Sequence, residues 1–215
     1  MKLYGAASSP FTERVRLALA FKGLACEEVL MTGQEVRSPP WREVNPTGKI
    51  PLLVTDEGVQ IPESETILDY LEDAYPDPPL KPESPIDRAR MRTVIRIHEN
   101  YVAPPLFRLF EQIAPATRKA DVTADEIARW RRGLTLLAGV VDEAPYAVCG
   151  RFTLADCVLF PGLMLCDLVA SIFEAGAVVG EQPRLAAYYA KAKEDPLMGA
   201  AYAAAQARAA RATAH

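Results

Sequence analysis

A proline-rich stretch divides this sequence into two parts with different patterns. Residues 75–85 read YPDPPLKPESP, with five prolines in eleven residues, a composition typical of a stiff, extended linker. Before this stretch, short apolar runs alternate with polar turns; after it, apolar residues recur at helical spacing. A chain of 215 residues is long enough for two small domains. We therefore predict a first domain over residues 1–76, a linker over 77–86 and a second domain over 87–215.

The first part predicts a small sheet with two helices. The expected elements are, in chain order, a strand over 2–4, a helix over 11–22, a strand over 26–30, a polar stretch over 32–47, strands over 51–54 and 59–61, and a helix over 64–74. The first strand, helix and second strand form a β-α-β unit, which implies a parallel pair with a right-handed crossover. The last two strands are close enough in sequence to form an antiparallel hairpin.

The second part predicts helices only. The expected ranges are about 87–114, 123–143, 153–170, 183–193 and 197–211. Pro104 and Pro105 fall inside the first of these, where we expect a kink because proline has no N–H to donate. Thr153 and Asp156 have the spacing of a capping box, which predicts a helix start there. The fold class predicted for the whole chain is therefore α/β plus all-α.

The charge balance and the apolar pattern exclude several classes of function. The net charge is −4, and no basic stripe extends beyond short arginine-bearing helix faces, so nucleic acid is not an expected partner. No run approaches the roughly 18 uninterrupted apolar residues of a membrane span, and the first residues lack the anatomy of a secretory signal. We therefore expect a cytoplasmic protein with no membrane partner. The four cysteines lack metal-binding spacing, so we expect reduced thiols and no metal site.

Four segments of the sequence carry a resemblance to a known family. They are SPFTERVRLALAFKG, NPTGKIPLL, IPESETILDYLE and FTLADCVLFP. In this order and spacing they resemble hallmarks of the cytosolic glutathione S-transferase superfamily, in particular its serine-type members such as the tau, zeta and omega-like bacterial proteins. The resemblance covers nearly the whole chain. It implies a thioredoxin-like N-terminal domain followed by an all-helical bundle, glutathione as co-substrate with no other cofactor, and a homodimer.

The resemblance also implies which residues hold glutathione. Family members have a cis proline where this chain has Ile50-Pro51, although the residues alone favour a trans bond, and the main chain of Ile50 would pair with the cysteinyl portion. Lys49 would meet the glycyl carboxylate, and Glu63 and Ser64 would hold the γ-glutamyl end. Taken without the family, Lys49 reads as a solvated loop residue, Glu63 as a surface acid and Ser64 as a cap or first-turn residue of a helix.

Ser9 is the candidate catalytic residue. It stands before Pro10, where redox relatives of this fold carry a cysteine that forms mixed disulfides with glutathione. A hydroxyl cannot do that exchange, but it can donate a hydrogen bond to the glutathione sulfur and lower the pKa of the thiol. In the tau and zeta classes the catalytic hydroxyl lies five residues before an arginine, which matches Ser9 and Arg14. Ser8 is the second choice, and Tyr4 is an alternative by analogy with tyrosine-type classes.

The acceptor site is less defined by the sequence. The resemblance places it beside the loop after the first strand and the first helix of the bundle, and the candidates are Phe11, Tyr101, Pro105 and Arg108; for each aromatic the alternative is a place in the core. His98 could act as an acid or base, but a single helix histidine beside a glutamate more often has a structural role.

We therefore expect a glutathione transferase whose thiolate attacks a small hydrophobic electrophile. One alternative is a glutathione-dependent isomerase, dehalogenase or ether-cleaving lyase. The zeta isomerase signature has Ser-Cys where this chain has Pro10 and Phe11, which disfavours a maleylacetoacetate isomerase. The other alternative is a non-catalytic glutathione-binding member of the superfamily.

Overall fold

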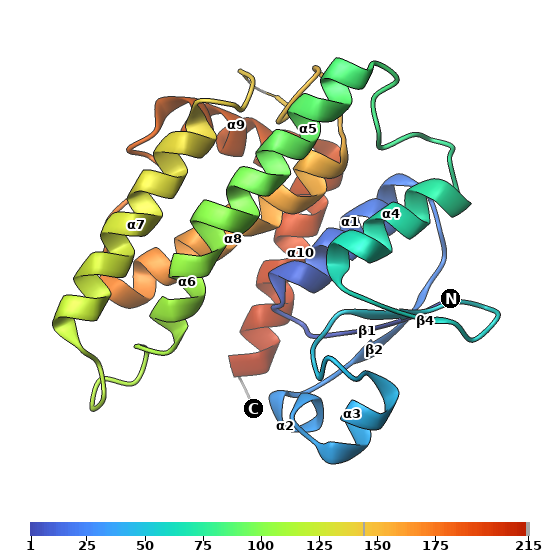
Figure 1. Cartoon of the computed structure of the whole chain (residues 1–215), viewed down its shortest axis with the longest axis horizontal. Coiled ribbons are helices and arrows are strands. Elements are labelled where there is room, and N and C mark those ends of the chain that lie inside the picture. Colours follow the sequence, from blue (N-terminus) through green and yellow to red (C-terminus); the bar gives the residue numbers. More distant parts are fainter. Residues whose placement is uncertain (144, 214–215) are drawn as a thin grey trace. The chain divides into compact units, whose positions relative to one another are not determined.

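The chain forms two compact groups of residues. The computed structural model in Figure 1 describes residues 1–143 and 145–213. One group, here named the sheet unit, comprises Met1–Leu80 and the described residues from Asp195 onward; the other, the helical unit, comprises Lys81–Glu194. The division near residue 80 falls inside the predicted linker. The predicted domain limits themselves stay a prediction.

The C-terminal helix is grouped differently from the prediction. α10 (Pro196–Thr213) belongs by its contacts to the sheet unit, where it packs against α1 (Pro10–Phe21). The sequence pattern predicts that this helix belongs to the helical domain over 87–215. Residues 214–215 lie outside the described part. Arg208 of α10 forms an ion pair with Glu13 of α1 and donates to the Ala7 carbonyl in the turn before α1. These long-range contacts, which no local pattern reveals, accompany the packing of the two helices.

The sheet unit contains a four-stranded mixed sheet in the order β2-β1-β3-β4. Its remaining elements are β1 (Lys2–Gly5), β2 (Glu27–Leu30), α2 (Gly33–Val36), α3 (Pro39–Val44), β3 (Leu52–Val54), β4 (Gln60–Pro62) and α4 (Ser64–Ala74). β1 and β2 are parallel, whereas β1 with β3 and β3 with β4 are antiparallel. The predicted β-α-β unit and hairpin are therefore confirmed. Figure 1 shows α1 and α4 on one side of the sheet and α2 and α3 on the other.

The register of the sheet brings three loops to one end. Tyr4 of β1 lies opposite Leu52 of β3, and Leu52 lies opposite Pro62 of β4. Because β1 and β3 are antiparallel, and so are β3 and β4, the end of β1, the start of β3 and the end of β4 are adjacent. The segments that contain Ser9, Ile50-Pro51 and Glu63-Ser64 therefore gather at the same end of the sheet.

Two short helices occupy the polar stretch over 32–47. α2 begins at a capping box in which Thr32 and Glu35 bond each other's backbone. α3 begins with Ser38 as N-cap and Pro39 in its first turn, a favoured arrangement at a helix start. Four and six residues are too few to show a helical period, so only these caps could have indicated the helices.

A buried ion pair holds the first part of the proline-rich stretch against the sheet unit. Lys22 Nζ lies 2.7 Å from Glu72 Oε2, and it also donates to the carbonyls of Tyr75 and Pro78 at 2.7 and 2.9 Å. Glu72 in turn accepts the N–H of Leu80. A buried charge is stable only with such partners, which explains why the sheet unit extends to Leu80.

The helical unit is built around one buried helix. Its elements are α5 (Pro85–Ile97), the π-helical η1 (His98–Val102), α6 (Ala103–Phe110), α7 (Ala120–Ala138), α8 (Leu154–Phe173) and α9 (Pro183–Glu194). The capping box of Thr153 and Asp156 is confirmed at the start of α8. The interruption predicted at Pro104 and Pro105 takes the form of η1, since two missing N–H donors leave the preceding carbonyls to a wider turn. The predicted fold class is confirmed.

By length and composition alone, α8 is apolar enough to cross a membrane, and it is the one such helix in the described ranges. Asp156 and Asp167 interrupt its apolar run, and 61% of its most apolar window is buried inside the protein. Such burial is typical of the core helix of a bundle.

Candidate active site

Ser9 caps the helix that follows it. Its Oγ accepts the N–H of Thr12 at 3.2 Å, so the side chain satisfies one of the free donors of the first turn of α1. Ser9 is half-buried, whereas Ser8 is exposed. Within the described residues the Ser9 hydroxyl proton has no acceptor. This proton can therefore be donated to a ligand while the oxygen keeps its role as cap.

The buried side chain of Thr12 fixes the turn between β1 and α1. Thr12 is fully buried, and its Oγ1 accepts the N–H of Ala6 at 3.3 Å. A Cβ on Gly5 would lie 2.2 Å from Thr12 Cγ2, so only glycine allows the strand to approach the helix this closely. The position of Ser9 is thus set by close packing on both sides of the turn.

The segment before β3 presents backbone groups at the same sheet end. The Ile50-Pro51 bond is cis, as the resemblance implied. Ile50 is half-buried, and its N–H and C=O make no hydrogen bond in the part of the chain described. Lys49 is exposed, but its carbonyl accepts from Trp41 Nε1 at 3.2 Å and from Asn45 Nδ2 at 2.8 Å. The backbone here is held firmly while the Lys49 ammonium is left to solvent or a ligand.

The start of α4 is built to receive a negative group. Glu63 occupies the N-cap without a side-chain cap bond, and Glu65 is the acidic residue of the first turn. The Glu63 side chain therefore leaves the positive end of the helix dipole to another group. Ser64, only 5% exposed, follows directly, and Arg14 Nη1 donates to its Oγ at 3.5 Å. The buried Arg14 guanidinium adds a full positive charge beside this helix start. This combination favours a carboxylate ligand.

Glu63 also adopts a backbone conformation that is unusual for its residue type. Its φ is 67°, in the region that residues with a Cβ rarely occupy. Such conformations cost roughly 1–3 kcal/mol and cluster at ligand-binding and catalytic sites. The strain is consistent with a backbone that places the Ser64 N–H and the Glu63 carboxylate for a ligand rather than for folding.

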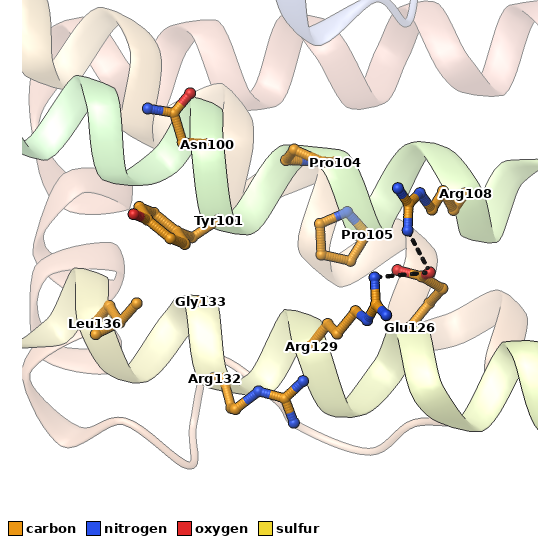
Figure 2. A pocket seen from close by; sticks show the side chains of 10 residues that line it. All are labelled: Asn100, Tyr101, Pro104, Pro105, Arg108, Glu126, Arg129, Arg132, Gly133 and Leu136. Carbon is orange, nitrogen blue, oxygen red and sulfur yellow. Dashed lines mark hydrogen bonds and ion pairs between the residues drawn. The ribbon is translucent and has the colours of Figure 1, made fainter.

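Three of the four acceptor candidates line one groove of the helical unit. Figure 2 shows Tyr101 of η1 and Pro105 and Arg108 of α6 on the side that faces the α7 residues Glu126 and Gly133. The groove has a volume of about 380 Å³, and its lining is completed by Asn100, Pro104, Glu126, Arg129, Arg132, Gly133 and Leu136.

The charges in this groove are partly paired. Arg108 Nη1 donates to Glu126 Oε1 at 3.0 Å, and Arg129 Nη1 lies 3.8 Å from the same oxygen. The hydrogen bond to Glu126 raises the pKa of the Arg108 guanidinium. Arg108 therefore stays charged, in a lining that combines apolar side chains with the charged Glu126, Arg129 and Arg132.

Phe11 and His98 do not line this groove. Phe11 lies in the sheet unit, where the Arg14 guanidinium stacks 4.5 Å from its ring centroid. His98 is 2% exposed, with Nδ1 3.0 Å from Glu99 Oε1. A Cβ on Gly162 would lie 2.1 Å from His98 Nε2. His98 is thus a packed side chain of the bundle core, in keeping with the structural reading of its sequence context.

Comparisons with known proteins decide the family. Residues 3–79 match the family model described as glutathione S-transferase, N-terminal domain. A maleylacetoacetate isomerase from Pseudomonas aeruginosa is 32% identical, over 76% of this chain and 80% of its own. A glutathione S-transferase from Pseudomonas putida is 32% identical, over 73% of this chain and 70% of its own. The chain belongs to the glutathione S-transferase family. A solved glutathione S-transferase from Methylobacterium radiotolerans, in complex with glutathione sulfonate, is 28% identical with a TM-score of 0.74, over 93% of each chain.

Two residues that support the site in this glutathione S-transferase family member were not singled out from the sequence. Asn45 is fully buried, and besides binding the Lys49 carbonyl its Oδ1 accepts from the N–H and hydroxyl of Thr47 at 3.1 and 3.0 Å. An asparagine side chain that accepts from the backbone N–H two residues ahead is typical of a turn. The Asn-Pro-Thr run could therefore have indicated this role of Asn45. Trp41 packs its ring 5.5 Å from that of Tyr4, a contact without a local signal.

Proposed function

We propose that this family member binds glutathione at the sheet end described above and that the Ser9 hydroxyl stabilises its thiolate. The observation that carries the proposal is the double use of the Ser9 side chain. Its oxygen accepts from Thr12 N–H, which fixes its position, while its proton is free of any acceptor among the residues described. A donor held in this way can meet a sulfur anion without first being reorganised.

The proposed chemistry places the nucleophile on glutathione and the activation on the protein. A free thiol has a pKa of about 8.5, so only a few per cent of it is thiolate at neutral pH. A hydrogen bond from Ser9 and the N-terminal end of α1 both favour the anion. The sulfur then forms a bond to the electrophilic carbon, and the leaving group departs with the electron pair of the bond that breaks.

Charged groups at the same sheet end support glutathione as the source of that thiol. Glutathione has a carboxylate at each end and an ammonium at its γ-glutamyl end. The start of α4, with Ser64 and the nearby Arg14, suits the γ-glutamyl carboxylate, and Glu63 suits the ammonium. We assign the glycyl carboxylate to Lys49 and the cysteinyl main chain to the unpaired N–H and C=O of Ile50, in the manner of an added strand.

The acceptor is proposed to be a small hydrophobic electrophile. The candidate contacts in the helical unit are Tyr101, Pro105 and Arg108, and Phe11 of the sheet unit is a separate candidate. The groove of about 380 Å³ is of a size suited to a small ligand. Its apolar side chains and its three arginines favour an apolar molecule that carries or develops negative charge.

A second candidate function is glutathione-dependent isomerisation, in which glutathione adds and is released again. The likeness to a maleylacetoacetate isomerase favours it. Pro10 and Phe11 stand where the zeta isomerase signature has Ser-Cys, and this departure favours conjugation. Net consumption of glutathione distinguishes conjugation from isomerisation, whereas halide or ether-fragment release reveals a dehalogenase or lyase.

The proposal is tested by screening a panel of electrophiles with and without glutathione. We expect turnover that requires glutathione and consumes it. Ser9→Ala is expected to lower kcat/KM by about tenfold to a hundredfold, because a hydrogen bond to a charged group is worth about 1.5–3 kcal/mol. The neighbouring Ser8→Ala is expected to retain most of the activity. Failure to bind immobilised glutathione would overturn the proposal, and tight binding without any turnover would identify a non-catalytic member.

We also propose that the chain is a cytoplasmic homodimer, as the family resemblance implies. Light scattering in solution is expected to give twice the mass of 23.5 kDa. A monomer at micromolar concentration would contradict this assignment.

A further inference from the structure

The turn that carries Ser9 is held from behind by two arginines. Ala6 and Ala7 directly precede the serine pair. Arg16 Nη2 donates to the Ala6 carbonyl at 3.1 Å, and Arg208 Nε donates to the Ala7 carbonyl at 3.1 Å. Consecutive carbonyls of the turn are therefore fixed by guanidinium groups from different helices.

Both arginines also bind the same buried carboxylate. Glu13 is 4% exposed, and its Oε2 accepts from Arg16 Nη1 at 2.8 Å and from Arg208 Nη2 at 2.5 Å. A buried carboxylate requires such partners, and removing one leaves the charge poorly compensated. Glu13 therefore links the two guanidinium groups, and Glu28 also holds Arg16 by accepting from its Nε at 2.8 Å. Each guanidinium group in addition donates one N–H to a turn carbonyl.

Fixing the Ala7 carbonyl also fixes the next N–H. The peptide bond between Ala7 and Ser8 is trans, since the cis bonds of the described chain lie elsewhere. In a trans peptide the C=O and the N–H point in opposite directions. The Ser8 N–H therefore points away from Arg208, and this N–H has no acceptor in the ranges described. The Ser9 hydroxyl follows one residue later.

Arg208 comes from the far end of the chain. It lies on α10, 195 residues after Glu13, and α10 packs against α1 within the sheet unit. The Arg208 side chain is 22% exposed, so most of it is enclosed. Only arginine offers a planar fork that can reach a carboxylate and a carbonyl together; lysine carries a point charge.

We propose that Arg208 is a positioning residue for the thiolate site and that α10 is part of the catalytic apparatus. This inference rests on the proposed function, because it assumes that Ser9 stabilises a glutathione thiolate. Arg208 acts through the Ala7 carbonyl and Glu13 and touches no substrate. Arg16 still holds the Ala6 carbonyl and Glu13 when Arg208 is removed, so the turn is loosened rather than lost.

The test compares Arg208→Ala with the matched control Arg211→Ala. Arg211 lies three residues further along α10 and is exposed, with no ion pair among the described residues. The main readout is the pKa of the glutathione thiol in the binary complex, measured by the ultraviolet absorbance of the thiolate. A purely structural role would not move this value. We expect Arg208→Ala to raise it by about one unit and to lower kcat/KM at neutral pH about tenfold, with little change in the Kd of glutathione.

The controls separate the possible failures. Arg211→Ala is expected to match the wild type, and Arg208→Lys to lie between the wild type and Arg208→Ala. An unchanged thiol pKa in Arg208→Ala, in a set where Ser9→Ala does raise it, would overturn this inference and leave the proposed function intact. An unchanged pKa in Ser9→Ala would overturn the proposed function itself. Should Arg208→Ala fail to fold, as judged by circular dichroism, the Arg208→Lys protein carries the test, and a wild-type thiol pKa in it would overturn the inference.

Discussion

At the scale of the residue, we propose two roles for one hydroxyl. Ser9 Oγ caps α1 by accepting from Thr12 N–H, and its proton remains for a ligand. Serine is common at helix N-caps, so the residue type alone does not reveal chemistry. The functional assignment depends on its neighbours at the sheet end, which are the unpaired backbone of Ile50 and the uncapped start of α4.

At the same scale, the buried carboxyl group of Asp156 predicts how the stability of the protein depends on pH. Burial raises its pKa to about 6, although it accepts hydrogen bonds from Ala147, Thr153 and Tyr188. Because this pKa lies above the value of about 3.9 in an unfolded chain, the folded protein binds the proton more tightly. The contribution of Asp156 to the free energy of unfolding is therefore fully present below about pH 4 and is lost as pH rises through about 6.

Urea unfolding of wild type and Asp156→Asn at a series of pH values measures this effect. The variant is expected to be less stable by about 1–3 kcal/mol, because an amide replaces an acceptor with a donor. The difference between the two proteins should be largest at low pH and shrink toward neutrality. A difference that is constant between pH 4 and pH 7 would show that Asp156 does not titrate as described.

At the scale of the element, the loop before β3 depends on one buried amide. Asn45 binds the Lys49 carbonyl and both the N–H and the hydroxyl of Thr47. The segment that carries Ile50 is therefore ordered by the buried Asn45 side chain. Proper placement of Ile50 and Lys49 is expected to matter for glutathione binding more than for the chemical step.

Asn45→Ala is expected to raise the KM for glutathione about tenfold with a smaller change in kcat. The loss of a buried hydrogen-bonding group should also lower the free energy of unfolding by about 1–3 kcal/mol. Steady-state kinetics with glutathione as the varied substrate, together with urea unfolding, provide the measurement. A lowered kcat at unchanged KM would indicate that this loop acts on the thiolate rather than on binding.

At the scale of the whole molecule, the sequence predicts the features that neighbouring residues determine. It misses the features that depend on contacts between distant residues. The helix over Ser64–Ala74 was predicted with its observed bounds because its apolar period and its start are both local. α2 and α3 were missed because each is too short to show a period. The φ of Glu63 and the packing of Trp41 on Tyr4 have no local sequence signal.

The C-terminal helix is the clearest case of a long-range cause. Its alanine-rich sequence correctly predicted a helix, but its place in the sheet unit follows from contacts such as that between Arg208 and Glu13, 195 residues apart. The candidate glutathione residues came from the family resemblance, and the strand register explains why they gather. For the groove, the sequence indicates only candidate residues on the first helix of the bundle. The other wall is formed by α7, and no local pattern shows that α7 packs there.

The measurement that tests the central claim most directly is the pKa of the glutathione thiol bound to wild type and to Ser9→Ala. A hydrogen bond to a charged group is worth about 1.5–3 kcal/mol, which corresponds to about one to two pKa units. We predict a thiol pKa in the wild-type complex at least about one unit below the free value of about 8.5, and a return toward that value in Ser9→Ala. Equal thiol pKa values in the two complexes would contradict the assignment of Ser9.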